Sequence, residues 1–392
     1  MSGTRPTRWT RHHLDALVES PATTAPPAPA APRPRVLPHH DIWDAWPLQQ
    51  SDGAPAVVHG AGLWMALSAP AAGHPEHRHD HARIRLLARS DERWDDLGHV
   101  FAAGTSLGSR EWSGSAVIRP DGTVSVFYTA AGRAGESRPT FRQRIVEARP
   151  ELLTGGQAVE LEQGVEHREV LRSDGRSYEP ADEFDGGPGR IRAFRDPSWF
   201  RDPADGREYL LVAASVPGPE GFMGAVAIAR AASGGWVLLP PLLVADGVNH
   251  EIERPHVVVH RSRYYLFFCT TRRSFHPAGS APTGLYGFVA PTLWGPYEPL
   301  NRSGLVIQNP PAQPDQAYAW LVLSSLRVTS FLNYRSANGK DPAQAGPDEA
   351  RAGFGGTFAP MLDLALEGTS TRVLRAPREE EWTAGDQPHP AS

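Results

Sequence analysis

The sequence predicts an all-β protein built as a β-propeller, with a central axial pocket at the start of its innermost strands. Short strand-like runs recur in hairpin pairs, and turns such as Asp121-Gly122 and Asp205-Gly206 separate the two strands of a pair. No strong helical pattern competes with them. A two-sheet sandwich is the alternative. The recurrent hairpin units favour the propeller, because that fold brings residues from distant parts of the sequence to one axis.

The composition fits a large globular core and a small neutral ligand. The 392 residues are 40% hydrophobic and 21% charged, and the formal net charge is -5. Basic residues form no run long enough to follow a phosphate backbone, which argues against nucleic acid as a partner. The longest uncharged apolar runs, residues 221–229 and 234–245, fall short of the roughly 18 residues that a membrane helix needs. The single cysteine, Cys269, lies in an apolar run and indicates core packing.

The first 35 residues are expected to lie outside the propeller. Residues 10–20 predict a short peripheral helix, with Leu14 and Leu17 on one side, and residues 21–35 are rich in proline and alanine. The folded part is expected to begin near Val36, so that residues 36–392 form one catalytic domain. Arginines near the N-terminus precede no apolar segment, and the sequence therefore predicts no secretory signal peptide.

Acidic residues stand at the start of several predicted hairpins. Asp44 lies between two tryptophans, Asp196 follows Arg195, and Glu253 lies two residues after Glu251. An extended chain places the two glutamates on one face, where each negative charge favours a proton on the other carboxylate. A solvated strand edge gives the same glutamate pattern, and a plain turn gives the Trp-flanked aspartate. In a propeller, Asp44, Asp196 and Glu253 would meet in one pocket.

Three carboxylates in a pocket lined by tryptophan and arginine are typical of retaining glycosyl transfer. One carboxylate attacks the anomeric carbon, a carboxylic acid about 5 to 5.5 Å away protonates the leaving oxygen, and the third binds sugar hydroxyls. Tryptophan faces pack against the C–H-rich faces of a sugar ring. The remote alternative is a propeller that only binds sugars, which would need no protonated carboxyl group.

Residues 73–81 contain four histidines at a spacing that matches no common metal signature. The segment lies between two strand-like runs, residues 63–68 and 83–88, so a solvated loop is predicted. The sequence predicts no metal site and no cofactor.

Ordered motifs along nearly the whole chain resemble glycoside hydrolase family 68, which comprises levansucrases, inulosucrases and bacterial β-fructofuranosidases. The motifs that carry the resemblance are Trp43-Asp44-Ala45-Trp46-Pro47-Leu48, Arg110-Glu111-Trp112-Ser113-Gly114, Phe194-Arg195-Asp196-Pro197, Glu251-Ile252-Glu253-Arg254-Pro255, Gln316-Ala317-Tyr318 and Phe354-Gly355-Gly356-Thr357-Phe358. The resemblance implies a five-bladed propeller and retaining fructosyl transfer from sucrose. It also implies that Asp44 is the nucleophile, Asp196 the transition-state stabiliser and Glu253 the acid/base.

The resemblance further implies which residues contact sucrose: Trp43, Trp112, Ser113, Arg195, Glu251 and Tyr318. The implied partners are sucrose and the fructosyl acceptors sucrose, fructan and water. A mainly hydrolytic, invertase-like β-fructofuranosidase or an inulosucrase remains open as the alternative. Family members suggest an extracellular protein, whereas the lack of a predicted signal peptide leaves a cytoplasmic one open.

Two positions depart from the family pattern. His250 stands where calcium-binding members have an aspartate, so no calcium is expected, and the chain is similar to the calcium-free branch from Gram-negative bacteria. Thr271 aligns with a histidine that positions the acceptor sugar in that branch, and a shift of one residue would place Arg272 there. On a strand the two side chains would point to opposite faces, so only one could serve, and Arg272 is the expected one. Transfer is then expected to stop mostly at short oligosaccharides, with much hydrolysis.

Overall fold

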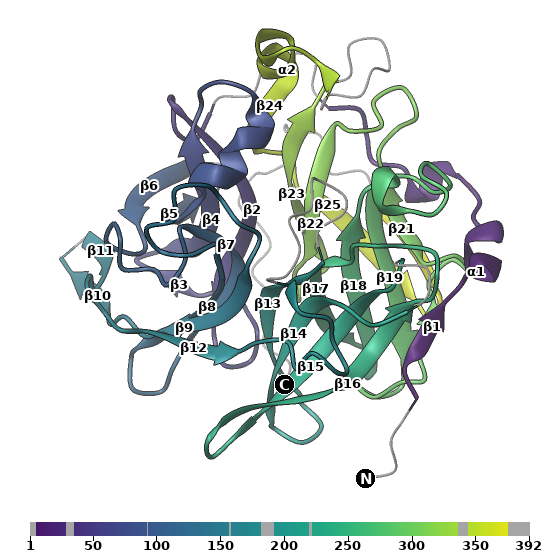
Figure 1. Cartoon of the computed structure of the whole chain (residues 1–392), viewed down its shortest axis with the longest axis horizontal. Helices are drawn as coiled ribbons and strands as arrows, with labels where there is room; N and C mark the ends of the chain where they lie inside the picture. The colour runs from purple at the N-terminus through teal and green to yellow at the C-terminus, as the bar shows by residue number, and fades with distance from the viewer. Residues whose placement is uncertain are drawn as a thin grey trace, which may run out of the picture.

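The computed structural model of the chain consists mainly of β-strands (Figure 1). The structure describes residues 5–28, 35–91, 93–156, 158–181, 192–218, 222–335 and 344–374. Within these ranges the α-helices α1 (Arg11–Asp15) and α2 (Pro347–Gly353) are both short, and no helix is long and apolar enough to cross a membrane. The predicted all-β class is confirmed.

One large sheet, drawn in blue and teal in Figure 1, holds two series of antiparallel strands. The first series is β2 (His40–Gln49), β4 (Ala61–Pro70), β5 (Arg83–Ser90) and β6 (Arg93–His99), with the short β3 (Val57–Val58) paired to β4. The second series is β7 (Arg110–Ile118), β8 (Val124–Ala131), β9 (Gln143–Ala148) and β12 (His167–Leu171). A short parallel contact between β2 and β7 joins them, and β10 (Leu152–Gly155) pairs with β11 (Ala158–Leu161) as a separate hairpin.

Three further sheets come from the second half of the chain. The first comprises β13 (Phe194–Arg201), β14 (Glu208–Ser215), β15 (Gly224–Ala232) and β16 (Gly235–Ala245). The next comprises β17 (Glu253–His260), β18 (Arg263–Thr270), β19 (Gly284–Ala290), β20 (Glu298–Pro299) and β21 (Leu305–Gln308). The last comprises β22 (Ala317–Val322), β23 (Arg327–Tyr334), β24 (Phe354–Phe358), β25 (Leu362–Glu367) and β26 (Ser370–Leu374).

The first strand of each series lies next to the first strand of the following series. Strands β2, β7, β13, β17 and β22 contact one another in that order, and β22 contacts β2 again. Each has a register shift against its antiparallel partner, directly after Trp43, Trp112, Arg195, Glu253 and Tyr318. A β-bulge bends a strand and changes the direction of its side chains. The five bulges therefore mark equivalent positions on the inner strands.

The N-terminal residues are expected to lie outside the folded part, but in the structure they are part of it. Strand β1 (Thr7–Trp9) pairs in parallel with β16, and the Trp9 side chain is fully buried. Its ring lies 5.5 Å from the ring of Phe268, and its Nε1 donates a hydrogen bond to the Ser303 carbonyl. The predicted start near Val36 is therefore wrong, because a large aromatic side chain gains more by completing a core than by remaining in water.

Part of the proline-rich segment also lies against the sheets. Within residues 21–28, the Ala25 N–H donates to the Gln308 carbonyl, and the Gln316 side chain bonds both Ala28 N–H and the Pro26 carbonyl. Because proline has no N–H, a side-chain amide that reaches neighbouring backbone groups replaces ordinary strand pairing. Residues 29–34 of this segment lie outside the described residues.

Candidate active site

Two of the predicted catalytic carboxylates stand at the bulges of inner strands. Asp44 on β2 has a φ of 49° and Asp196 on β13 has a φ of 58°. Few residues other than glycine adopt this left-handed conformation, and aspartate is among those that tolerate it. The bulge thus sets the direction of each carboxylate, and such a conformation persists only where its surroundings hold it.

Asp44 on β2 accepts a hydrogen bond from the second strand series. The Ser113 hydroxyl donates to Asp44 Oδ2 at 2.5 Å. The buried Trp43 ring meets His79 edge-on at 5.6 Å, and Trp112 Nε1 donates to the His79 carbonyl at 3.2 Å. A hydroxyl donor fixes one carboxylate oxygen of Asp44 while the neighbouring indoles are held by the same histidine residue.

Charged groups gather on the opposite side of the site, around Arg195. Its Nη2 atom lies 3.0 Å from Glu251 Oε1 and 3.2 Å from Glu253 Oε1, and its Nε lies 3.8 Å from Asp196 Oδ2. The Tyr318 hydroxyl donates to Glu253 Oε2 at 2.6 Å. The structure therefore brings Glu251 and Glu253 together, as their spacing predicts, although β17 begins only at the second of them.

Glu253 and Asp196 both have pKa values above the usual range of a carboxyl group, but by different amounts. Burial raises the pKa of Glu253 to about 7; the charges of Glu251 and Asp196 act in the same direction, while Arg195 opposes them. Burial also raises the pKa of Asp196 to about 6, against the effect of Arg195 and with the help of Asp44. A glutamate that keeps its proton close to neutral pH is suited to general acid catalysis.

Thr271 and Arg272 lie beyond the end of β18, and the expectation that they alternate on a strand is wrong. Arg272–Ser274 form the 3-10 turn η4, since the strand ends at Thr270. Thr271 Oγ1 lies 3.2 Å from Ser274 Oγ, which in turn donates to Glu251 Oε2 at 3.2 Å. Arg272 Nη2 lies 3.0 Å from Asp315 Oδ2. Thr271 therefore connects to Glu251 through Ser274, whereas Arg272 pairs with Asp315.

The histidine-rich segment is not the solvated loop that the sequence predicts. Residues Pro75–His81 form the 3-10 helix η2, and Arg78 is only 6% exposed, with its guanidinium 5.4 Å from the Trp43 ring. The Tyr334 hydroxyl donates to Glu76 Oε1. Burial acts to raise the pKa of Glu76, but Arg78, His79 and the Tyr334 hydrogen bond together lower it to about 2. Burial and then Arg78 lower the pKa of His79 to about 3. The segment forms a wall behind Trp43 and Trp112, which no local sequence signal indicates.

His250 does not contribute to a cluster of metal ligands. Among the residues that the structure describes, no group of three or more His, Cys, Asp or Glu side chains could hold a metal ion. The His250 N–H donates to the Ser274 carbonyl, and its ring meets Phe222 edge-on at 6.1 Å.

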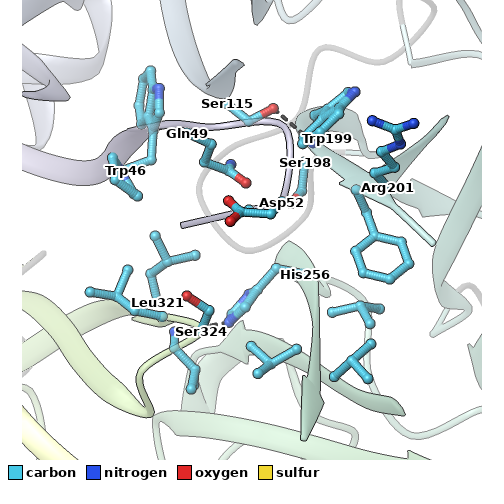
Figure 2. Close-up of a pocket in the computed structure, with 18 of the residues that line it drawn as sticks. Trp46, Gln49, Asp52, Ser115, Ser198, Trp199, Arg201, His256, Leu321 and Ser324 are labelled. Carbon is cyan, nitrogen blue, oxygen red and sulfur yellow. Dashed lines mark hydrogen bonds between the residues drawn. The ribbon is translucent and has the colours of Figure 1, made fainter. Parts of the chain in front are cut away.

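A cavity of about 470 Å³ lies beyond the catalytic carboxylates, along the later halves of the inner strands (Figure 2). Trp46, Gln49 and Asp52 lie on one side of it, and Leu321 and Ser324 lie on the other. Asp196 and Arg254 are part of its wall. The cavity thus reaches the rear of the candidate active site.

An all-β fold with a buried glutamate of raised pKa close to Asp196 is typical of carbohydrate-active enzymes of the glycoside hydrolase class. The chain belongs to the Levansucrase/Invertase family, whose model matches residues 1–227 and 219–383. This finding confirms the resemblance seen in the sequence.

Individual relatives agree with the family assignment. Levansucrase LscA of Pseudomonas savastanoi pv. glycinea is 32% identical, covering 94% of this chain and 94% of its own. The structure of inulosucrase from Halalkalicoccus jeotgali bound to kestose is 41% identical, with a TM-score of 0.88 over 94% of this chain and 95% of that one. The levansucrase from Gluconacetobacter diazotrophicus shares the fold at 24% identity, with a TM-score of 0.79 over 95% of this chain and 90% of that one.

Proposed function

We propose that this protein transfers the fructosyl group of sucrose, through a covalent fructosyl-enzyme, to sugar acceptors and to water. The observation that carries the proposal is the convergence of Asp44, Asp196 and Glu253 from three inner strands, with Arg195 beside the last two. Family membership supports the same substrate, because levansucrases and an inulosucrase are among the relatives.

The first step breaks the glycosidic bond of sucrose. A carboxylate oxygen of Asp44 forms a bond to the anomeric carbon of the fructosyl unit, and the electron pair of the broken bond goes to the glucosyl oxygen. Glu253 donates its proton to that oxygen, and glucose leaves. The hydrogen bond from Ser113 orients Asp44 for the attack.

In the second step, Glu253 acts as a base and Asp44 as the leaving group. Glu253, now ionised, removes a proton from the acceptor hydroxyl, whose oxygen attacks the anomeric carbon and releases Asp44. Asp196 accepts hydrogen bonds from fructosyl hydroxyls, and these bonds strengthen as positive charge develops on the ring. Water as the acceptor gives fructose, and a sugar gives an oligosaccharide or a fructan.

The remaining predicted residues take binding roles in this proposal. Those nearest the three acids would contact sucrose: Trp43, Trp112, Ser113, Arg195, Glu251 and Tyr318. Thr271 and Arg272 would shape the acceptor end, since one connects to Glu251 through Ser274 and the other pairs with Asp315.

The proposed architecture is a five-bladed propeller with the site on its axis. The closed order of contacts among β2, β7, β13, β17 and β22 supports it, as does the bulge that each of these strands carries. One unit of this kind would hold all catalytic residues within a single domain.

A product profile from sucrose alone tests the function. The purified protein is incubated with sucrose, and free glucose, free fructose and fructans are separated by chromatography. We expect glucose to exceed free fructose, with the difference recovered in fructosylated products. A protein that releases no glucose from sucrose would contradict the proposal.

A further inference from the structure

Arg254 lies at the centre of the inner strands without touching the sugar-binding side chains through its guanidinium. It is 6% exposed, and its Nη1 and Nη2 atoms donate to the carbonyls of Ala319 and Ala45, each at 2.6 Å. Its backbone N–H donates to Asp196 Oδ2 at 3.1 Å. One residue of β17 thus contacts β22, β2 and β13.

The three hydrogen bonds that Arg254 donates fall on a catalytic candidate or on the residue after a site residue. Ala45 follows Asp44, and Ala319 follows Tyr318, the partner of the Glu253 carboxyl. Arg254 itself follows Glu253. Arg254 is therefore linked to all three predicted catalytic acids. Its guanidinium binds the residue after Asp44, its N–H binds Asp196, and Glu253 precedes it in the chain.

The conformation of Arg254 matches this position. Its φ is 51°, in the left-handed region that Asp44 and Asp196 also adopt at their bulges. His256 holds the Arg254 carbonyl at 3.0 Å through Nδ1, while its Nε2 accepts the Val322 N–H at 3.0 Å. Because Nε2 is the acceptor, Nδ1 carries the proton that is donated to Arg254. The backbone of Arg254 is thus fixed on both sides.

Burying a guanidinium costs free energy of desolvation, and joining two strands does not by itself require a charged side chain. Apolar residues of similar volume often replace buried charged groups with no loss of stability. A planar guanidinium, however, holds two acceptors at fixed directions, which no apolar side chain can do. The two short bonds to carbonyls point to control of the spacing between strands.

We propose that Arg254 is a positioning residue for fructosyl transfer, setting the spacing of Asp44, Asp196 and Glu253 by joining their strands. The proposal rests on the proposed function. Retaining transfer requires a fixed separation of nucleophile and acid, and a misplacement of about 1 Å can lower the rate by about 100-fold.

The first test compares Arg254→Ala with Arg144→Ala. Arg144 also donates to two backbone carbonyls, those of Leu107 and Gly132, at 2.7 and 3.0 Å, and neither bond involves a predicted catalytic acid. Initial rates with sucrose give kcat and KM, and circular dichroism checks folding. We expect Arg254→Ala to lose about 100-fold in kcat with KM changed less than about threefold, and Arg144→Ala to keep kcat within about twofold.

Rescue by guanidinium separates positioning from a merely structural role. Arg254 lines the rear cavity, so a small cation can reach the space that the shortened side chain leaves. Guanidinium chloride at millimolar concentration, far below denaturing conditions, should restore kcat of Arg254→Ala by about tenfold, because the same donors return to the same carbonyls. It should not raise the rate of the parent or of Arg144→Ala.

The outcomes remain decisive if Arg254→Ala does not fold. Arg254→Lys keeps the charge but can reach only one of the two carbonyls, and we expect it to fold and to lose about tenfold in kcat. A folded Arg254→Ala or Arg254→Lys protein with the parent kcat would overturn the positioning role, as would an equal loss in Arg144→Ala. If the parent itself does not cleave sucrose, the proposed function fails instead, and the parent assay shows this directly.

Discussion

The two sides of the candidate site hold their acids in contrasting ways. On the side of β2 and β7, Asp44 accepts a hydrogen bond from the Ser113 hydroxyl, and Trp43 and Trp112 both contact His79. On the side of β13 and β17, Arg195 joins Glu251, Glu253 and Asp196 in one charged cluster. Equivalent bulges on the inner strands therefore present acids in two different environments.

This contrast explains how one pocket can hold both a nucleophile and an acid. The charged cluster is buried and carries three carboxylates beside one arginine, so a proton on Glu253 relieves the repulsion between them. Asp44 instead accepts a hydrogen bond from the Ser113 hydroxyl, outside this charged cluster. Environments that separate two acids in this way define their roles.

The largest expected effect comes from replacing Asp44, the proposed nucleophile on β2. Asp44→Asn keeps the shape and the bond to Ser113, but its amide oxygen cannot form the covalent intermediate. We expect kcat for sucrose to fall by about 10⁴-fold or more, with the melting temperature within a few degrees of the parent. Asp121→Asn, in an exposed hairpin turn, is the matched control and should leave both values unchanged. Activity within about tenfold of the parent would remove Asp44 from this role.

The second prediction concerns the acid of the charged side. Glu253→Gln cannot donate a proton to the leaving glucose, so we expect a loss of about 10²- to 10⁴-fold in kcat. A fructoside whose leaving group needs no proton should partly bypass the defect in the first step. Initial rates with sucrose and with the activated fructoside measure the two cases. An equal loss with both substrates would argue against the acid assignment.

The sequence predicts the all-β class because hairpins depend on local patterns, and local motifs also single out the three candidate acids. Alternating apolar residues and Asp-Gly turns define hairpins such as β7–β8 and β13–β14, and the acids stand in motifs that begin the inner strands. No local pattern indicates that Trp9 completes a distant core, or that Arg78 packs against Trp43. Those contacts join segments far apart in the chain, and isolated aromatic or basic residues do not identify their partners.

The expectation that Thr271 and Arg272 alternate on a strand fails directly after the end of β18. An apolar run ends in Thr270-Thr271, both β-branched, and nothing in these residue types separates the last strand residue from the first turn residue. The turn is stabilised by bonds from Arg272 N–H to Thr283 and from Arg272 Nη2 to Asp315. Tertiary contacts of this kind override the alternation that a strand would impose.

A third prediction uses the pH dependence of kcat/KM to test the pKa values of Glu253 and Asp196. Glu253 must hold a proton, so kcat/KM should fall as the pH rises through its pKa of about 7. Asp196 must be ionised to accept sugar hydroxyls, so kcat/KM should also fall as the pH decreases through its pKa of about 6. The profile should be bell-shaped with a mildly acidic optimum. A rate that still rises above about pH 8 would contradict a required protonated carboxyl.

Glu251→Gln sharpens this test. The charge of Glu251 helps raise the pKa of Glu253, and its loss leaves Arg195 to act on fewer carboxylates. Both effects lower the pKa of Glu253, so the basic limb of the profile should move to lower pH, together with a reduced kcat/KM. An unmoved basic limb would show that the charge of Glu251 does not set the proton affinity of Glu253.

The smallest expected effect lies at the acceptor end of the charged side, where sugar and water compete for the fructosyl-enzyme. Arg272→Ala removes the ion pair with Asp315 and loosens the segment after β18, so we expect the ratio of transfer to hydrolysis to fall about two- to threefold. Thr271→Val removes only the hydroxyl that meets Ser274, and its ratio should stay closer to that of the parent. Chromatography of free glucose and free fructose measures both variants at equal sucrose conversion. A change with Thr271→Val and none with Arg272→Ala would instead place acceptor control on the chain from Thr271 through Ser274 to Glu251.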